Sequence, residues 1–124
     1  MTGNLLLYLA SLLTVIWGVA HLFPTKNVVK GFGAISLDNQ RVITMEWINE
    51  GVTLIFIGVL TAAVTLSDPA SPVARLVYWL AIIMLNALSI ISLFTGFRVN
   101  FLPYRLCPII FTGSSLLILL GMSL

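Results

Sequence analysis

Four long apolar stretches dominate the chain, and short polar segments separate them. The stretches cover about residues 4–23, 38–66, 73–95 and 106–122. A helix needs about 20 apolar residues to cross ~30 Å of hydrocarbon, and each stretch is close to that length or longer. Because peptide groups in lipid must bond within their own segment, such stretches become helices. The pattern therefore predicts four membrane-crossing helices.

Residues that stop or cap helices lie at the ends of these stretches. Pro24 follows the first one, and proline cannot continue the hydrogen-bond ladder of a helix. Ser36 or Asp38 can cap the second. Pro108 is expected in the first turn of the fourth helix, where a missing N–H has no cost. The polar segment at residues 67–72 has the composition of a compact turn, which makes the second and third helices antiparallel neighbours.

These features together predict an all-α fold. The expected architecture is an integral membrane four-helix bundle with antiparallel up-down-up-down order, and residues 1–124 form a single transmembrane domain. The composition agrees, since 60% of the residues are hydrophobic and only 8% are charged. Ten charged side chains could not keep the surface of a soluble protein of this length dispersed. Lipid must cover most of the surface.

Basic residues are concentrated in the two longer polar connections. An up-down-up-down order places both connections on one membrane face, and only Arg75 falls on the other face. By the positive-inside rule the first face is cytoplasmic, and both termini lie on the non-cytoplasmic side. The expected location is the inner (cell) membrane of a bacterium. No run of Lys and Arg offers a phosphate-binding stripe, so nucleic acid is not an expected partner.

The second helix carries the most informative polar pattern. Glu46, Asn49, Glu50 and Thr53 follow one another at i, i+3, i+4 and i+7, which puts them on one helix face. Carboxylates are costly in contact with lipid, so we expect this face to point into the bundle. The sequence therefore predicts a polar pocket at the cytoplasmic end.

Other polar residues are expected at the same membrane depth on neighbouring segments. The predicted ligand-binding set is His21, Glu46, Asn49, Glu50, Asn86, Arg98, Arg105 and Trp17. Such a pocket could bind a polar head group. His21 and Glu50 could also act as acid and base if the protein is an enzyme. In the competing interpretation Glu46 and Glu50 pair with Arg98, Arg105 or Arg41 and only fix helix packing.

The remaining candidate chemistry is sparse. Di-metal bundles use a Glu-x-x-His pair on each of two helices, whereas this chain has one histidine, so no metal site is predicted. The pattern assigns no cofactor. Trp47 and Tyr104 are interpreted as part of an aromatic belt at the membrane interface. Cys107 is interpreted as a small packing residue.

The layout resembles that of the DoxX-like group of small four-span membrane proteins. The features that carry the resemblance are a first helix ending in Gly18-x-x-His21, a polar connection, and a second helix that opens with acidic residues. The resemblance implies a membrane-embedded bundle and little more, although such proteins are often small partners of membrane redox systems. The layout is also similar to the four-helix fold of sterol isomerases and related EXPERA proteins, but no catalytic residue is carried over from them.

Two functions remain open from the sequence. The first is an accessory subunit, or a partner that binds a lipid- or quinone-type ligand, in a membrane complex. Its partners would be membrane lipids and either other membrane subunits or further copies of the chain. The second is a small membrane enzyme with isomerase-like acid and base chemistry on a lipid or isoprenoid substrate, using Glu50 and His21.

Overall fold

The computed structural model describes residues 1–124 and is entirely helical. Four helices are long and apolar enough to cross a membrane: α1 (Thr2–Leu22), α3 (Leu37–Ser67), α4 (Pro72–Phe94) and α5 (Leu102–Ser123). The predicted all-α bundle with four spans is therefore confirmed, and the chain is an integral membrane protein. α3 has 31 residues, or ~46 Å of helix, so it is longer than a hydrocarbon core of ~30 Å.

The polar connections contain more structure than predicted. A short helix, α2 (Thr25–Gly31), lies in the first connection, and a 3₁₀ turn, η1 (Gly96–Arg98), lies in the second. α5 begins at Leu102 and not near residue 106. Pro108 is consequently inside the helix, and its predicted place in the first turn is wrong. Pro103 occupies that turn, where its missing N–H has no cost.

Capping side chains fix the helix boundaries around α3 and α4. Of the two predicted caps for α3, Ser36 acts as the N-cap, since its Oγ accepts a hydrogen bond from the Asn39 N–H at 3.2 Å. Ser71 does the same for α4 and accepts from the Ala74 N–H at 3.1 Å. The turn between the two helices is as compact as predicted.

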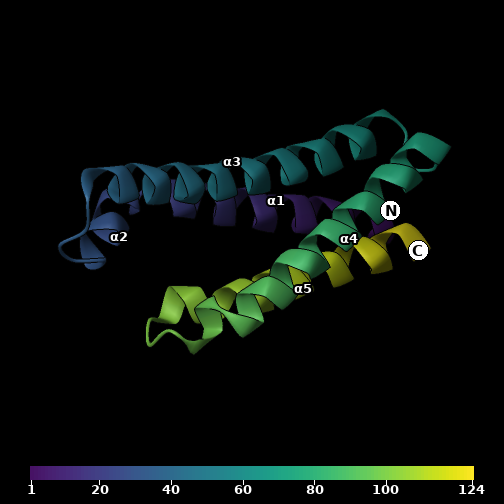
Figure 1. The fold of residues 1–124 in the computed structure, drawn as a ribbon. Coiled ribbons are helices and arrows are strands. Elements are labelled where there is room, and N and C mark those ends of the chain that lie inside the picture. The colour runs from purple at the N-terminus through teal and green to yellow at the C-terminus, as the bar shows by residue number, and fades with distance from the viewer.

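The four long helices form two pairs that diverge from each other. α1 packs along α3, and α4 packs along α5, while α1 and α5 join the two pairs. Figure 1 shows the pairs close together near the two termini and apart at the end that carries α2. α3 and α4 are in contact near their connecting turn and separate from there onward. The bundle is therefore closed at one end and open at the other.

The side chains separate into a buried interior and an apolar outer face. The fully buried apolar side chains come from all four long helices and include Leu7, Leu54, Leu85 and Phe111. Large apolar side chains such as Leu12, Phe56 and Ile83 are exposed on the outside, as expected for surfaces that face lipid.

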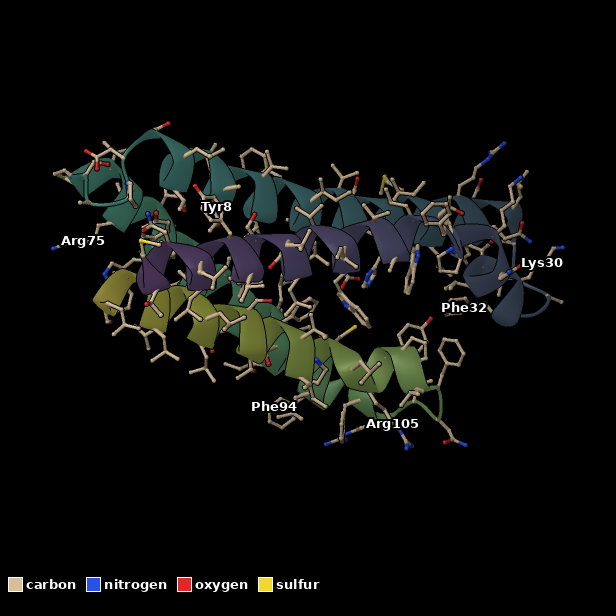
Figure 2. The ribbon with its side chains drawn as sticks, turned by 180° about the vertical axis from the view of Figure 1, so that it is seen from behind. Tyr8, Lys30, Phe32, Arg75, Phe94 and Arg105 are labelled. Atoms are coloured by element: carbon tan, nitrogen blue, oxygen red, sulfur yellow. The ribbon has the colours of Figure 1, made fainter.

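The charged side chains mark the two ends of the bundle. Lys30 and Arg105 lie at the open end, and Arg75 lies at the opposite end (Figure 2). This distribution is what the predicted helix order requires.

Candidate functional site

Close contact between α1 and α3 sets up the site at the open end. A Cβ atom on Gly18 would lie 2.7 Å from the carbonyl oxygen of Gly51, and one on Gly51 would lie 2.9 Å from that of Gly18. Only glycine permits this approach. His21 follows Gly18 by one helical turn, and Glu50 directly precedes Gly51. The glycine contact therefore brings the two ionisable side chains to the same level.

His21 and Glu50 form an ion pair across the two helices. Nε2 of His21 lies 3.5 Å from Oε1 of Glu50. The His21 side chain is 6% exposed, whereas that of Glu50 is 34% exposed. The imidazole is thus part of the interior, and the carboxyl group lies between the interior and the space outside it. The sequence prediction that these two residues share one membrane depth is consistent with this contact.

The hydrogen bonds of His21 determine where its protons lie. Nδ1 is 2.9 Å from the carbonyl oxygen of Trp17, and a carbonyl can only accept, so Nδ1 carries a hydrogen. Nε2 then faces the carboxyl group of Glu50. Two lone pairs at this distance repel each other, so the contact is favourable when Nε2 or the carboxyl group holds a proton. The pair is therefore a site that holds one proton next to an open space.

Aromatic side chains surround the imidazole. The ring of Trp47 lies 5.1 Å from that of His21, and its indole N–H donates to the His21 carbonyl. Tyr104 of α5 contacts Trp47 edge to face at 5.6 Å. Trp17 lies on the other side of His21 at 5.9 Å. These contacts hold the imidazole in one orientation and provide flat apolar surfaces beside it.

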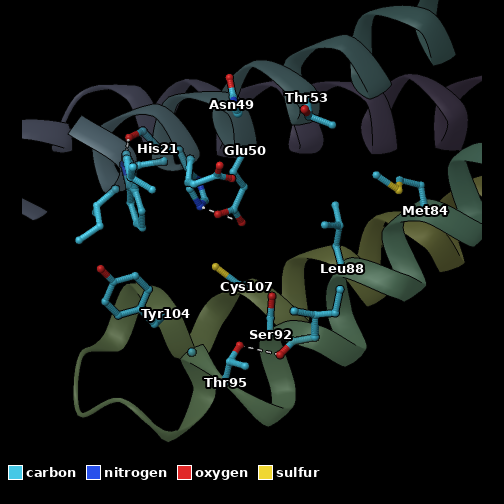
Figure 3. Close-up of a pocket in the computed structure, with 16 residues that line it drawn as sticks. His21, Asn49, Glu50, Thr53, Met84, Leu88, Ser92, Thr95, Tyr104 and Cys107 are labelled. Atoms are coloured by element: carbon cyan, nitrogen blue, oxygen red, sulfur yellow. Dashed lines mark hydrogen bonds and ion pairs between the residues drawn. The ribbon is translucent and has the colours of Figure 1, made fainter. Parts of the chain in front are cut away.

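The His21–Glu50 pair lies in the wall of a cavity with a volume of about 580 Å³. α3 contributes Glu46, Asn49, Glu50 and Thr53 to its lining. The opposite wall comes from α4, with Met84, Leu88, Ile91 and Ser92. Figure 3 shows His21 and Glu50 between Tyr104 and Met84 along this space, with Cys107 pointing toward them from α5. The cavity thus lies in the region where α3 and α4 diverge.

A smaller cavity of about 320 Å³ adjoins the large one. His21, Trp47, Tyr104 and Cys107 line both cavities, and Trp17 lines only the smaller one. The rest of the smaller lining comes from the end of α1, from α2 and from the start of α5. It is mostly apolar. The contact of Trp47 with Tyr104 lies between the two spaces.

The structure brings together half of the predicted ligand-binding set. His21, Glu46, Asn49 and Glu50 line the large cavity. Asn86 does not, because its side chain donates to the Ile82 carbonyl at 2.8 Å and to Ser115 Oγ at 2.6 Å.

Neither arginine of the set reaches the cavity. Arg98 is exposed on η1, and Arg105 donates to the Val99 carbonyl and to Asn100 Oδ1, both at 3.2 Å. The predicted pairing of Glu46 and Glu50 with arginines is absent too. The two ion pairs present join His21 to Glu50 and Asp38 to Arg41.

Sequence reasoning missed several residues of the wall. Trp47 and Tyr104 are predicted for an interfacial belt and Cys107 for packing. Cys107 does pack in the buried core, and all three residues also line the cavity. A signal for Trp47 exists, since it precedes Glu50 by three positions and so lies near the acidic face of α3. Cys107 has no such signal, because its position depends on where α5 begins.

The site can accept and donate hydrogen bonds, hold or exchange one proton, and stack a flat group against Trp47. No third His, Cys, Asp or Glu lies with His21 and Glu50 in an arrangement that could hold a metal ion. Comparison with family models, with curated proteins and with solved structures finds no match to this chain.

Proposed function

We propose that this protein binds an amphipathic membrane ligand of quinone type, with the polar ring of the ligand against His21 and Glu50. The observation that carries the proposal is the His21–Glu50 pair, with its half-buried carboxyl group, in the wall of a cavity of about 580 Å³. Cavities that bind small molecules commonly measure ~300–1,000 Å³ and combine apolar walls with a few polar groups. This cavity has that size and composition.

The polar and flat parts of a quinone ring match the groups in the wall. A ring oxygen can accept a hydrogen bond from the proton that the His21–Glu50 pair holds, and a quinol hydroxyl can donate to the Glu50 carboxylate. The ring face can stack on Trp47, which lies beside His21. The protein then serves a larger membrane assembly by holding this ligand. In support, the connections between the helices are too short to hold a catalytic domain.

A second function, isomerase-like acid and base chemistry on a lipid or isoprenoid substrate, is favoured by one specific observation. The Trp17 carbonyl fixes the orientation of the imidazole, so that Nε2 points toward Glu50. Acid–base catalysis requires such an oriented pair beside the substrate. Incorporation of solvent deuterium into the bound ligand would favour the enzyme over the binding protein.

We also propose the inner (cell) membrane of a bacterium as the location, with the site at the cytoplasmic face. The support is the distribution of charge. α2, η1 and the starts of α3 and α5 carry five of the six basic residues, and all of these segments belong to the open end. The positive-inside rule assigns such an end to the cytoplasm.

Binding of decylubiquinone to the purified protein in phosphatidylcholine nanodiscs tests the proposed function. Quenching of tryptophan fluorescence reports binding after subtraction of the signal from empty nanodiscs. Glu50→Gln should weaken binding by about tenfold or more, because a hydrogen bond to a charged group contributes ~1.5–3 kcal/mol. Asp38→Asn removes a carboxylate outside the cavity and should leave the affinity unchanged.

The fold of each variant is checked by circular dichroism and by size-exclusion chromatography. A Glu50→Gln protein that is folded and binds the quinone as tightly as the wild type would refute the proposal. So would a wild-type protein that binds no quinone above the background of empty nanodiscs.

A further inference from the structure

α3 and α4 are joined at one end and apart at the other. Near their connecting turn the Tyr78 hydroxyl lies 2.9 Å from Thr65 Oγ1, and both side chains are buried. Thr65 also donates to the Thr61 carbonyl at 2.7 Å. Its one hydroxyl hydrogen is used there, so Tyr78 donates to Thr65. From this contact the helices diverge toward the cavity, which fills the space between them (Figure 3).

One face of α4 lies along this space without a partner helix. Met84, Leu88 and Ile91 recur at i, i+4 and i+7 and line the cavity. Met84 is 42% exposed and Ile91 is 60% exposed. The neighbouring positions Leu85 and Ser89 are buried instead, and Ser89 donates to the Pro108 carbonyl of α5 at 3.0 Å. α4 therefore uses one face to pack on α5 and leaves an apolar stripe facing α3.

The lining changes in character along the cavity. At the end near the polar connections α3 offers Glu46, Asn49 and Glu50, together with the apolar Val42 and Ile43. One turn further toward the closed end its last lining residue is Thr53, opposite Met84 and Leu88. Met84 lies 12 residues from the first residue of α4, or ~18 Å along a helix that can cross the bilayer. The part of the cavity that lies deeper in the membrane, around Thr53, Met84 and Leu88, therefore has no ionisable side chain.

We infer that the opening between α3 and α4 is a lateral port through which a ligand with a single apolar chain enters from the bilayer. The inference rests on the proposed function. In the bound state the ring contacts His21 and Glu50, and the chain passes Met84 and Leu88 and leaves between the two helices. The chain then stays in an apolar environment throughout, so binding does not require it to cross water.

The smaller cavity is the other place where a chain could lie. His21, Trp47, Tyr104 and Cys107 line both this cavity and the large one, so they lie at the border between the two. Trp47 is held in this wall by its hydrogen bond to the His21 carbonyl and by its edge-to-face contact with Tyr104. A chain that reached the smaller cavity from the site of the ring would have to pass or displace these side chains. The opening between α3 and α4 requires no such change.

The position of the chain can be measured by photocrosslinking in nanodiscs. The probe is a decylubiquinone analogue with a diazirine at the end of its chain, and the labelled residues are located by mass spectrometry. Labelling of α3 and α4 near Thr53, Met84 and Leu88 is expected. Labelling of Val28, Phe101 or Leu102, which line the smaller cavity, would overturn the inference. So would labelling that excess unlabelled decylubiquinone does not reduce.

A bulky side chain in the port provides an independent test. Leu88→Trp should weaken binding of decylubiquinone at least fivefold but leave the tailless ring, 2,3-dimethoxy-5-methylbenzoquinone, within about twofold of wild type. Ile83→Trp is the matched control, because Ile83 is on the same helix, is 63% exposed and does not line the cavity.

The two quinones separate failure of the port from failure of the proposed function. If neither quinone binds the wild-type protein, the proposed function is wrong. If both bind and Leu88→Trp affects neither, the ring site stands and the port is refuted. If a bound partner helix and not a lipid chain fills the opening, the photoprobe will fail to label α4, which also refutes the port.

Discussion

Gly58 lies directly against α1 in the interface with α3. A Cβ atom there would be 2.7 Å from the Ser11 carbonyl oxygen and 2.6 Å from Cγ2 of Val15. Ser11 also donates its hydroxyl hydrogen to the Gly58 carbonyl at 2.6 Å. Gly58→Ala should therefore separate the helices and lower the free energy of unfolding by about 1–3 kcal/mol, measured by SDS titration in mixed micelles.

Gly113 is the control for this substitution. It is also inside a long helix, but a Cβ atom there would have nothing within 4 Å. Gly113→Ala should change the free energy of unfolding by no more than about 1 kcal/mol, the difference in helix propensity between the two residues. Equal losses in the two variants would show that close helix approach at Gly58 does not matter for stability.

Individual residues also show how much of the candidate site could be predicted from the sequence. Glu46, Asn49 and Glu50 are spaced at i, i+3 and i+4 on a helix that is otherwise mostly apolar. The sequence alone therefore shows that these three residues lie on one face of the helix. Asn86 shares a face of α4 with Ser89, three positions further on, but this spacing does not reveal which neighbouring helix the face contacts. Its amide is satisfied by Ile82 and Ser115, a pairing that depends on the packing of two helices. Tertiary contacts of this kind have no local signal.

At the scale of the helix, the buried contact between Tyr78 and Thr65 holds α3 to α4 at the closed end. Tyr78→Phe should cost about 0.5–1.5 kcal/mol, because Thr65 keeps its bond to the Thr61 carbonyl. Thr65→Val should cost more, about 1–3 kcal/mol, because it leaves the Tyr78 hydroxyl buried without an acceptor. Unfolding in SDS measures both losses.

Tyr8→Phe is the matched control, since Tyr8 is only half-buried on α1. It should leave the stability unchanged. If Tyr78→Phe proves as harmless as Tyr8→Phe, the hydrogen bond does not hold the two helices together.

Helix positions were more predictable than helix ends. The four apolar stretches gave each span to within a few residues, because length and hydropathy alone decide whether a segment can cross the bilayer. α5 begins at Leu102, four residues before the predicted start near residue 106, because Pro103 and Tyr104 are typical of a polar connection. α2 was missed because seven residues with four polar side chains and no apolar period resemble a loop.

At the scale of the whole molecule, the divergence of the two helix pairs was not predictable. The up-down-up-down order makes α3 and α4 antiparallel neighbours. It does not predict that these two helices separate along their length, as they do in the structure. The glycine contacts draw α1 toward α3, and the polar contacts of Ser89 draw α4 toward α5. The cavity results from these two preferences acting together.

The orientation of the whole molecule can be tested with single cysteines. Cys107→Ala removes the native thiol, and Asn27→Cys in α2 or Ala70→Cys in the closed-end turn then adds one exposed thiol while all six basic residues remain. The open end carries five of those six, so it should be retained in the cytoplasm. In intact bacterial spheroplasts a membrane-impermeant maleimide should label position 70 and leave position 27 unlabelled. Position 27 should react only after the membrane is broken, and labelling of position 27 in intact spheroplasts would place the ring site on the outer face instead.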